Sequence, residues 1–215
     1  MKAIYFDQPG PPEVMKLVDC EIPKIKDEQI LIKVKFSGVN RPDIIQREGN
    51  YPAPPGHSKI LGLEVSGVVS KIGSKVKKFN KGDEVAALVN GGGYAEYCVA
   101  DQETVFKLPN NISLKEAATI PECFFTVWSN LIMRGKLKKN QSVLVHGGTS
   151  GIGIAAIQIL KLFDCEIFTT VGSQEKKSFC KKIGVQNIFN YKEKDFSEEI
   201  KKLKPMGLNM ILDFI

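Results

Sequence analysis

The amino-acid sequence predicts an α/β protein, with a β-rich domain first and a doubly wound parallel sheet second. Three observations support this prediction. Residues 141–163 have the pattern of a strand, a glycine-rich turn and an amphipathic helix. Strand and helix patterns alternate after that stretch, as they do in parallel sheets. Before it, short apolar runs alternate with glycine and proline turns, which is typical of a compact barrel-like domain.

The first part of the chain is rich in predicted strands. Short apolar or alternating runs occupy residues 3–6, 14–18, 30–36, 64–72, 84–89 and 94–99. Ser113 and Glu116 have the spacing of a capping box, which predicts a helix over residues 114–119. Pro121 favours the start of a further helix over residues 121–134. We place the domain boundary at this proline, with residues 1–121 in the first domain and residues 122–215 in the second.

A glycine-rich turn follows the predicted strand 142–146. Glycines lack a Cβ atom, so the backbone can turn tightly there and approach a pyrophosphate at the N-terminus of the next helix. The G-x-G-x-x-[GA] pattern fits in two registers, one starting at Gly151 and one starting at Gly148 with Ser150 in its second position. We favour the second, because it puts the turn directly after the strand. The candidate cofactor-binding residues are Gly148, Thr149, Ser150, Gly151, Ile152 and Gly153. The alternative is an ordinary tight turn between a strand and a helix.

The elements after this turn repeat the same alternation. Strands are predicted at residues 166–171, 187–191 and 208–214, and helices at residues 174–183 and 196–203. This order predicts a parallel sheet with helices on both faces. Because the sequence ends within the last predicted strand, we expect this sheet to be incomplete.

The residues after strand 166–171 bear on the choice of cofactor. NAD sites usually carry an acidic residue here for the ribose 2′-hydroxyl, whereas NADP sites offer basic groups to the 2′-phosphate. The chain offers Ser173, Lys176 and Lys177, which favours NADPH. Glu175 is the nearest acid and weakens this argument, and the lysines could simply form a solvated helix face.

Composition excludes several classes of protein. The 215 residues are 43% hydrophobic and 25% charged, which is ordinary for a globular chain. We expect no membrane span and no signal peptide, and therefore a cytoplasmic location. Five scattered cysteines argue against a disulfide framework. The formal charge is +6, but acids are interleaved with the lysines, so no specific nucleic-acid partner is expected.

Several motifs together resemble one enzyme family. They are SGVNRPD at residues 37–43, ILGLEVSG at 60–67, GYAEY at 93–97, AATIPE at 117–122 and the glycine turn. In these motifs the chain resembles the zinc-free quinone oxidoreductase branch of the medium-chain dehydrogenase/reductase superfamily. His146, Ser150 and the run 189–192 resemble the p53-inducible group within that branch. The resemblance implies a GroES-like catalytic domain followed by a Rossmann-type NAD(P)-binding domain that is truncated.

The resemblance also implies roles for individual residues. Asn40 and Thr126 would lie near the nicotinamide, and Tyr51 at the acceptor pocket, where it is a hypothetical proton donor. Ser173, Lys176 and Tyr191 would surround the 2′-phosphate. Each has a structural alternative: Asn40 could satisfy a turn, Thr126 could bond its own helix backbone, Tyr51 could cap a surface, and Tyr191 could pack on the sheet.

The family resemblance also bears on metal binding. Zinc alcohol dehydrogenases of the superfamily carry a cysteine ligand where this chain has Asn40 and a histidine where it has Leu63. An amide and a leucine cannot replace a thiolate and an imidazole, so no catalytic metal is expected. A quinone can accept hydride without a metal, because the added charge delocalises into the hydroquinone. The expected reaction is therefore hydride transfer from NADPH to a quinone or a conjugated carbonyl.

Two alternatives remain open. The first is an enoyl or enone reductase on the same fold. The second is a non-catalytic, truncated homologue that acts as a binding protein. Members of the family are longer than this chain, so we expect a fragment, a truncated gene product or a partial sequence, whose full-length form is a homodimer.

Overall fold

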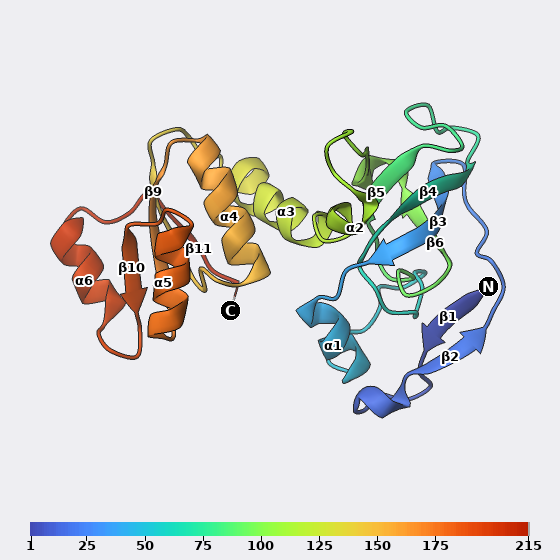
Figure 1. Cartoon of the computed structure of the whole chain (residues 1–215), viewed down its shortest axis with the longest axis horizontal. Helices are drawn as coiled ribbons and strands as arrows, with labels where there is room; N and C mark the ends of the chain where they lie inside the picture. The colour runs from blue at the N-terminus through green and yellow to red at the C-terminus, as the bar shows by residue number, and fades with distance from the viewer. Residues whose placement is uncertain (215) are drawn as a thin grey trace. The chain divides into compact units, whose positions relative to one another are not determined.

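The protein is described by a computed structural model that covers residues 1–214. The chain forms two compact units, the first Met1–Glu122 and the second beginning at Cys123 (Figure 1). None of the helices within residues 1–214 is long and apolar enough to cross a membrane.

A five-stranded antiparallel sheet forms the centre of the first unit, in the order β6-β3-β4-β5-β7. Its strands are β3 (Gln29–Ser37), β4 (Glu64–Ile72), β5 (Glu84–Leu88), β6 (Tyr97–Asp101) and β7 (Val105–Lys107). The pairing of β3 with β4 shifts register twice, once between Leu31 and Ile32 and once between Val34 and Phe36. Such irregularities increase strand twist, and the sheet is curled. Alternate residues on its inner face, including Ile30, Ile32 and Val65, are fully buried.

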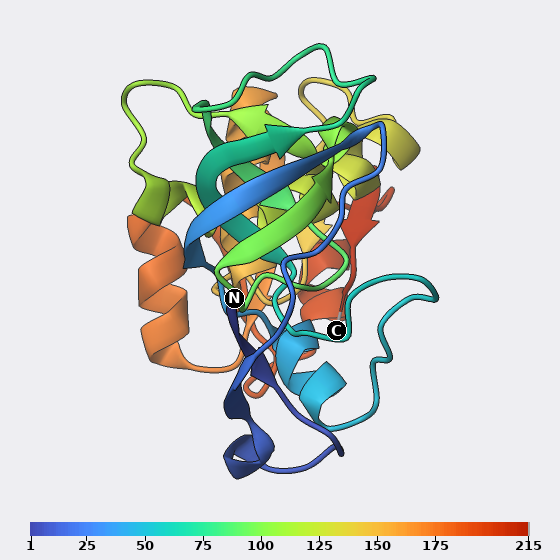
Figure 2. The same cartoon turned by 90° about the vertical axis from the view of Figure 1, so that its right-hand side faces the viewer.

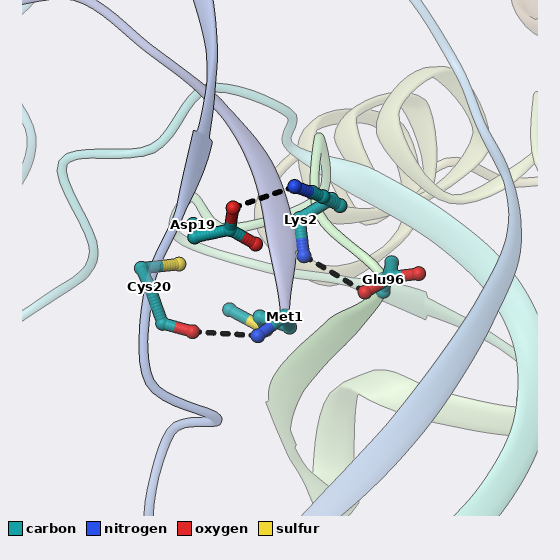
Figure 3. Close-up of polar contacts among 5 residues, drawn as sticks. All are labelled: Met1, Lys2, Asp19, Cys20 and Glu96. Carbon is teal, nitrogen blue, oxygen red and sulfur yellow. Dashed lines mark hydrogen bonds and ion pairs between the residues drawn. The ribbon is translucent and has the colours of Figure 1, made fainter.

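The N-terminus of the chain adds a two-stranded antiparallel hairpin, β1 (Lys2–Tyr5) with β2 (Lys16–Asp19). Figure 2 shows this hairpin below the curled sheet. The Met1 α-amine donates to the Cys20 carbonyl over 2.6 Å, and Lys2 pairs through its ammonium with Asp19 and through its backbone N–H with Glu96 (Figure 3). These contacts fix the register of the hairpin and join it to the sheet.

Short helical segments complete the first unit. They are α1 (Arg41–Arg47), α2 (Leu114–Ala117) and the 3₁₀ turns Pro12–Val14 and Gln102–Thr104. The helix α3 (Pro121–Val127) begins at the end of this unit and continues as a π-helical segment, Trp128–Arg134.

The second unit contains a four-stranded parallel sheet in the order β10-β9-β8-β11. Its strands are β8 (Ser142–Val145), β9 (Glu166–Val171), β10 (Asn187–Asn190) and β11 (Met210–Leu212), and its helices are α4 (Gly151–Leu162), α5 (Gln174–Lys182) and α6 (Phe196–Leu203). Val143 and Val145 pack on the α4 and α5 face, whereas Leu144 packs against Ile200 of α6 on the other face (Figure 1). The sheet is therefore covered on both sides, as the alternating pattern predicted.

The predicted α/β class is confirmed, one local prediction was wrong, and two elements were missed. Residue 14 lies in a 3₁₀ turn rather than a strand, and β7 and α1 were not predicted at all. The α1 sequence has seven residues, mostly polar, which is too short for a helical periodicity to show. The helix predicted over 121–134 changes to π-helical geometry at Trp128.

Candidate functional site

The glycine-rich turn joins β8 to α4 in the second unit. Ser150 is the N-cap of α4, and its hydroxyl accepts a hydrogen bond from the Gly153 amide (2.9 Å) and donates one to the Gly147 carbonyl (2.8 Å). One serine thus closes the turn and starts the helix.

Two glycines are required by close packing in this turn. A Cβ at Gly148 would lie 2.2 Å from the Thr169 hydroxyl oxygen, and a Cβ at Gly153 would lie 2.3 Å from the Gly147 carbonyl oxygen. Both distances are far below contact, so a side chain at either position would displace the turn. Gly148 and Gly153 are the first and third fixed positions of the G-x-G-x-x-[GA] pattern in the favoured register, which starts at Gly148.

The first turn of α4 offers backbone donors. Within residues 1–214, the amides of Gly151 and Ile152 make no hydrogen bond to the protein. Such amides, together with the positive end of the helix dipole, form a binding site for anionic groups. The turn therefore has the steric and hydrogen-bonding features of a phosphate cradle.

Strand β9 contacts the glycine-rich turn through Thr170. The Thr170 hydroxyl contacts His146 Nδ1 at 3.0 Å and accepts from the Gly147 amide at 3.3 Å. The Thr170 carbonyl accepts from the Gly148 amide at 3.1 Å. Since Thr170 is 2% exposed, these bonds are shielded from water and hold the turn in one conformation.

The predicted 2′-phosphate residues lie at the ends of β9 and β10. Ser173 is the N-cap of α5 and accepts from the Lys176 amide at 3.2 Å. The Tyr191 backbone pairs with Val171, and the Tyr191 hydroxyl lies beside Gly172, 2.5 Å from where a Cβ would be. Tyr191 therefore approaches the residue directly before Ser173. The Lys176 side chain is exposed, and so is that of Glu175.

Asn40 of the first unit is held by two buried carboxylates. It is the N-cap of α1, and its backbone amide donates to Asp43 over 2.8 Å. Its side-chain Nδ2 donates to Glu64 Oε1, also over 2.8 Å. Gly38 leaves the space for this carboxylate, because a Cβ there would overlap Glu64 Oε1.

These carboxylates belong to an acidic cluster, which we define as Asp43, Glu64 and Glu122. Asp43 also accepts from the Gly62 amide (3.1 Å) and the Tyr94 hydroxyl (3.0 Å). Glu64 Oε2 accepts from the Glu122 amide over 2.9 Å. Asp43 and Glu64 are each 2% exposed, while Glu122 is half-buried in the first turn of α3.

Burial raises the pKa of each carboxyl group in the acidic cluster. Desolvation raises the pKa of Asp43 and of Glu64, although the hydrogen bonds they accept act in the opposite direction. Desolvation and the two neighbouring carboxylates raise the pKa of Glu122 to about 7. Desolvation and the Asp43 charge also raise the pKa of Tyr94.

The other two predicted catalytic residues are not members of this cluster. Tyr51 is 46% exposed and follows α1, whereas Asn40 precedes it, so about 10 Å of helix separates them. Thr126 lies half-buried on α3, and its carbonyl accepts from the Asn130 side chain at 2.8 Å. One turn earlier, the Cys123 sulfur lies 2.8 Å from where a Gly151 Cβ would be, so α3 packs against the glycine turn within the second unit.

Comparisons with known proteins place this geometry in a family. The model of the alcohol dehydrogenase GroES-like domain matches residues 26–110, and that of the zinc-binding dehydrogenase matches residues 151–215. The Homo sapiens quinone oxidoreductase is 36% identical, with 100% of this chain and 66% of that protein covered. The solved quinone oxidoreductase of Coxiella burnetii is 33% identical, with a TM-score of 0.86 and 100% of this chain and 68% of that chain covered. This chain belongs to the quinone oxidoreductase family.

Two further solved structures are similar to this chain. The CurK enoyl reductase has a TM-score of 0.89 at 27% identity, with 100% of this chain and 67% of that chain covered. A mycobacterial protein complexed with NADPH has a TM-score of 0.87 at 29% identity, with 99% of this chain and 66% of that chain covered. The chain thus spans about two thirds of the length of the relatives it matches. The family assignment confirms a GroES-like fold followed by a Rossmann-like fold, and the narrower likeness to the p53-inducible group stays a prediction.

The acidic cluster is the part of the candidate site that sequence reasoning missed. Asp43 and Glu64 both lie in motifs that carried the family resemblance, and an acid inside the apolar run 60–67 was the available signal. Within residues 1–214, no group of three or more histidine, cysteine, aspartate or glutamate side chains is arranged to hold a metal ion.

Proposed function

We propose that this chain is part of an NADPH-dependent oxidoreductase that transfers hydride to a quinone without a metal. The observation that supports this best is the glycine turn, where close packing at Gly148 and Gly153 leaves the first-turn amides of α4 open to a pyrophosphate. We further propose a cytoplasmic enzyme whose full-length form is a homodimer.

The residues of the second unit fit the cofactor. The amides of Gly151 and Ile152 would bind the pyrophosphate, and Thr149 lies in the same turn. Ser173, Lys176 and Tyr191 would bind the 2′-phosphate, since they offer two hydroxyls and an ammonium where an NAD site would carry an acid. The NADPH complex of the mycobacterial neighbour supports this choice.

The chemistry needs few protein groups. When bound, the nicotinamide supplies the hydride. Asn40 and Thr126 would orient its ring, and Tyr51 would line the acceptor pocket. Because an amide and a leucine occupy positions 40 and 63, the donor set does not fit zinc. The protein would therefore act by positioning the reactants and excluding water, which suffices for an acceptor that delocalises the added charge.

An enoyl or enone reductase is the second candidate, and the likeness to CurK favours it. A conjugated carbonyl delocalises charge as a quinone does, so the same residues could serve both acceptors. Turnover on a benzoquinone, compared with turnover on an enoyl thioester, distinguishes the two.

A thermal-shift measurement tests the cofactor assignment. At a hundredfold excess over the dissociation constant, NADPH should stabilise the chain by about 2.7 kcal/mol, and NADH at the same concentration should stabilise it less. Oxidation of NADPH by the quinone then tests the activity. A chain that shifts with neither nucleotide is instead the non-catalytic homologue.

A further inference from the structure

A chain of hydrogen bonds runs from the start of the glycine turn to the His146 side chain. The Gly147 amide donates to the Thr170 hydroxyl oxygen over 3.3 Å, and the same oxygen lies 3.0 Å from His146 Nδ1. All three residues belong to the second unit, and the proposed function gives His146 no role. Because Thr170 is buried, water cannot take the place of either partner.

The single proton of the Thr170 hydroxyl determines the direction of this chain. The hydroxyl accepts from the Gly147 amide, so its own proton needs an acceptor, since a buried donor without a partner is costly. Within residues 1–214, His146 Nδ1 is the only acceptor that the hydroxyl contacts. An imidazole nitrogen accepts only when it carries no proton, so the ring proton of His146 lies on Nε2.

Three elements hold His146 in place. Its backbone amide donates to the Leu212 carbonyl over 3.2 Å, at the end of β11. Its ring meets the Phe196 ring of α6 edge-on, with centroids 5.3 Å apart, and its Nδ1 contacts β9 through Thr170. The ring therefore presents Nδ1 to the Thr170 hydroxyl in one fixed position.

Gly147 is the residue at which the chain turns after β8. Its φ is 64°, in the left-handed region that favours glycine. Its carbonyl accepts from the hydroxyl of Ser150, the N-cap of α4, while its amide donates to Thr170. These two bonds set the orientation of the peptide groups on either side of Gly147, and the position of the α4 N-terminus depends on both.

We propose that His146 is a positioning residue for the bound dinucleotide. This inference rests on the proposed function. His146 Nδ1 accepts the proton of the Thr170 hydroxyl, which leaves the lone pairs of that oxygen for the Gly147 amide and holds the turn in the conformation that binds the pyrophosphate. Because NADPH and NADH share the pyrophosphate, His146 acts on both nucleotides alike, unlike the residues proposed for the 2′-phosphate.

The decisive variant is His146→Ala, with His57→Ala at the exposed second histidine as the matched control. We expect H146A to raise the dissociation constants of NADPH and NADH by the same factor, about 3- to 10-fold, since one buried hydrogen bond is lost. H146N should restore affinity, because its Oδ1 takes the place of Nδ1. H146Q should not, because its carbonyl reaches the position of Nε2. H57A should bind both nucleotides as the wild type does.

Two further measurements test the hydrogen bond itself. Thr170→Val keeps the shape of the side chain and removes the hydroxyl, so H146A should cause no further loss of affinity in that background. Nitrogen-15 magnetic resonance at pH 8 should show an unprotonated Nδ1 in His146. Its signal should shift in T170V, while the signals of His57 stay unchanged.

Several outcomes would overturn the inference. Wild-type affinity in H146A does so, and so does a protonated Nδ1 or an additive loss in the double variant. Equal losses in H146A and H146N also overturn it, because the ring would then act through its packing on Phe196. A wild-type chain that binds neither nucleotide overturns the proposed function itself, and the role of His146 with it.

Discussion

The Asn40 side chain donates a hydrogen bond to Glu64, from Nδ2 to Oε1 over 2.8 Å. Glu64 is 2% exposed, so water cannot replace this donor. Because only the amino end of the carboxamide can donate to a carboxylate, the bond also fixes the orientation of Asn40 and directs its Oδ1 away from Glu64.

Asn40→Ala tests this bond. The substitution leaves Glu64 Oε1 without its donor, and an unsatisfied buried acceptor costs about 1–3 kcal/mol. Urea unfolding at pH 7 should show this loss in the free energy of unfolding. Asn50→Ala, at an exposed asparagine, should change it by less than about 0.5 kcal/mol. Equal losses in the two variants would contradict the role of the bond.

Glu122 should make stability depend on pH. Its pKa is raised by folding, so the folded chain binds more protons than the unfolded chain between pH 4.5 and about 7. The free energy of unfolding should therefore fall as pH rises through this range, by about 1–2 kcal/mol after allowance for solvent screening. E122Q should remove this part of the slope and be more stable than wild type at pH 8. Parallel slopes for the two proteins would refute the shift.

Gly153→Ala should distort the glycine turn. Alanine favours a helix over glycine by about 1 kcal/mol, but the new Cβ would lie 2.3 Å from the Gly147 carbonyl oxygen. We expect the steric conflict to dominate, with a net loss of about 1–3 kcal/mol and weaker NADPH binding. Calorimetric unfolding and nucleotide titration measure both effects. A variant with wild-type stability and affinity would show that the turn can relax.

Lys176→Ala should reduce the preference for NADPH. Removal of one ammonium from the 2′-phosphate should weaken NADPH binding about tenfold and leave NADH binding unchanged, since a charge-assisted hydrogen bond contributes about 1.5–3 kcal/mol. Lys182→Ala, at the other end of α5, is the matched control. If both nucleotides lose affinity equally, Lys176 does not recognise the phosphate.

The parallel sheet and its glycine turn could be predicted from local patterns. Apolar strands, a helical periodicity and glycines determine that geometry within about twenty residues, and the predicted ranges of β9 and α6 agree with the structure. The turn at Gly148 could be placed correctly for the same reason. Elements shorter than two helical turns, such as α1, have no periodicity to read.

The acidic cluster could not be predicted, because it depends on contacts across long stretches of sequence. Asp43, Glu64 and Glu122 come from α1, β4 and α3, and although the apolar run around Glu64 indicates burial of that one acid, nothing local in the sequence relates the three. Only the fold brings Glu64 to Asn40 and to the Glu122 amide, 24 and 58 residues away along the chain. The raised pKa of Glu122 follows from that arrangement and not from its neighbours in sequence.

The π-helical segment gives the second unit its own optical signal. Trp128 opens this segment, is 47% exposed, and is the single tryptophan in the sequence. Its fluorescence therefore reports on the second unit alone, while four of the five tyrosines lie in the first unit. Excitation of tryptophan and far-ultraviolet circular dichroism, recorded on the same sample, can thus show whether the two units unfold together or one after the other.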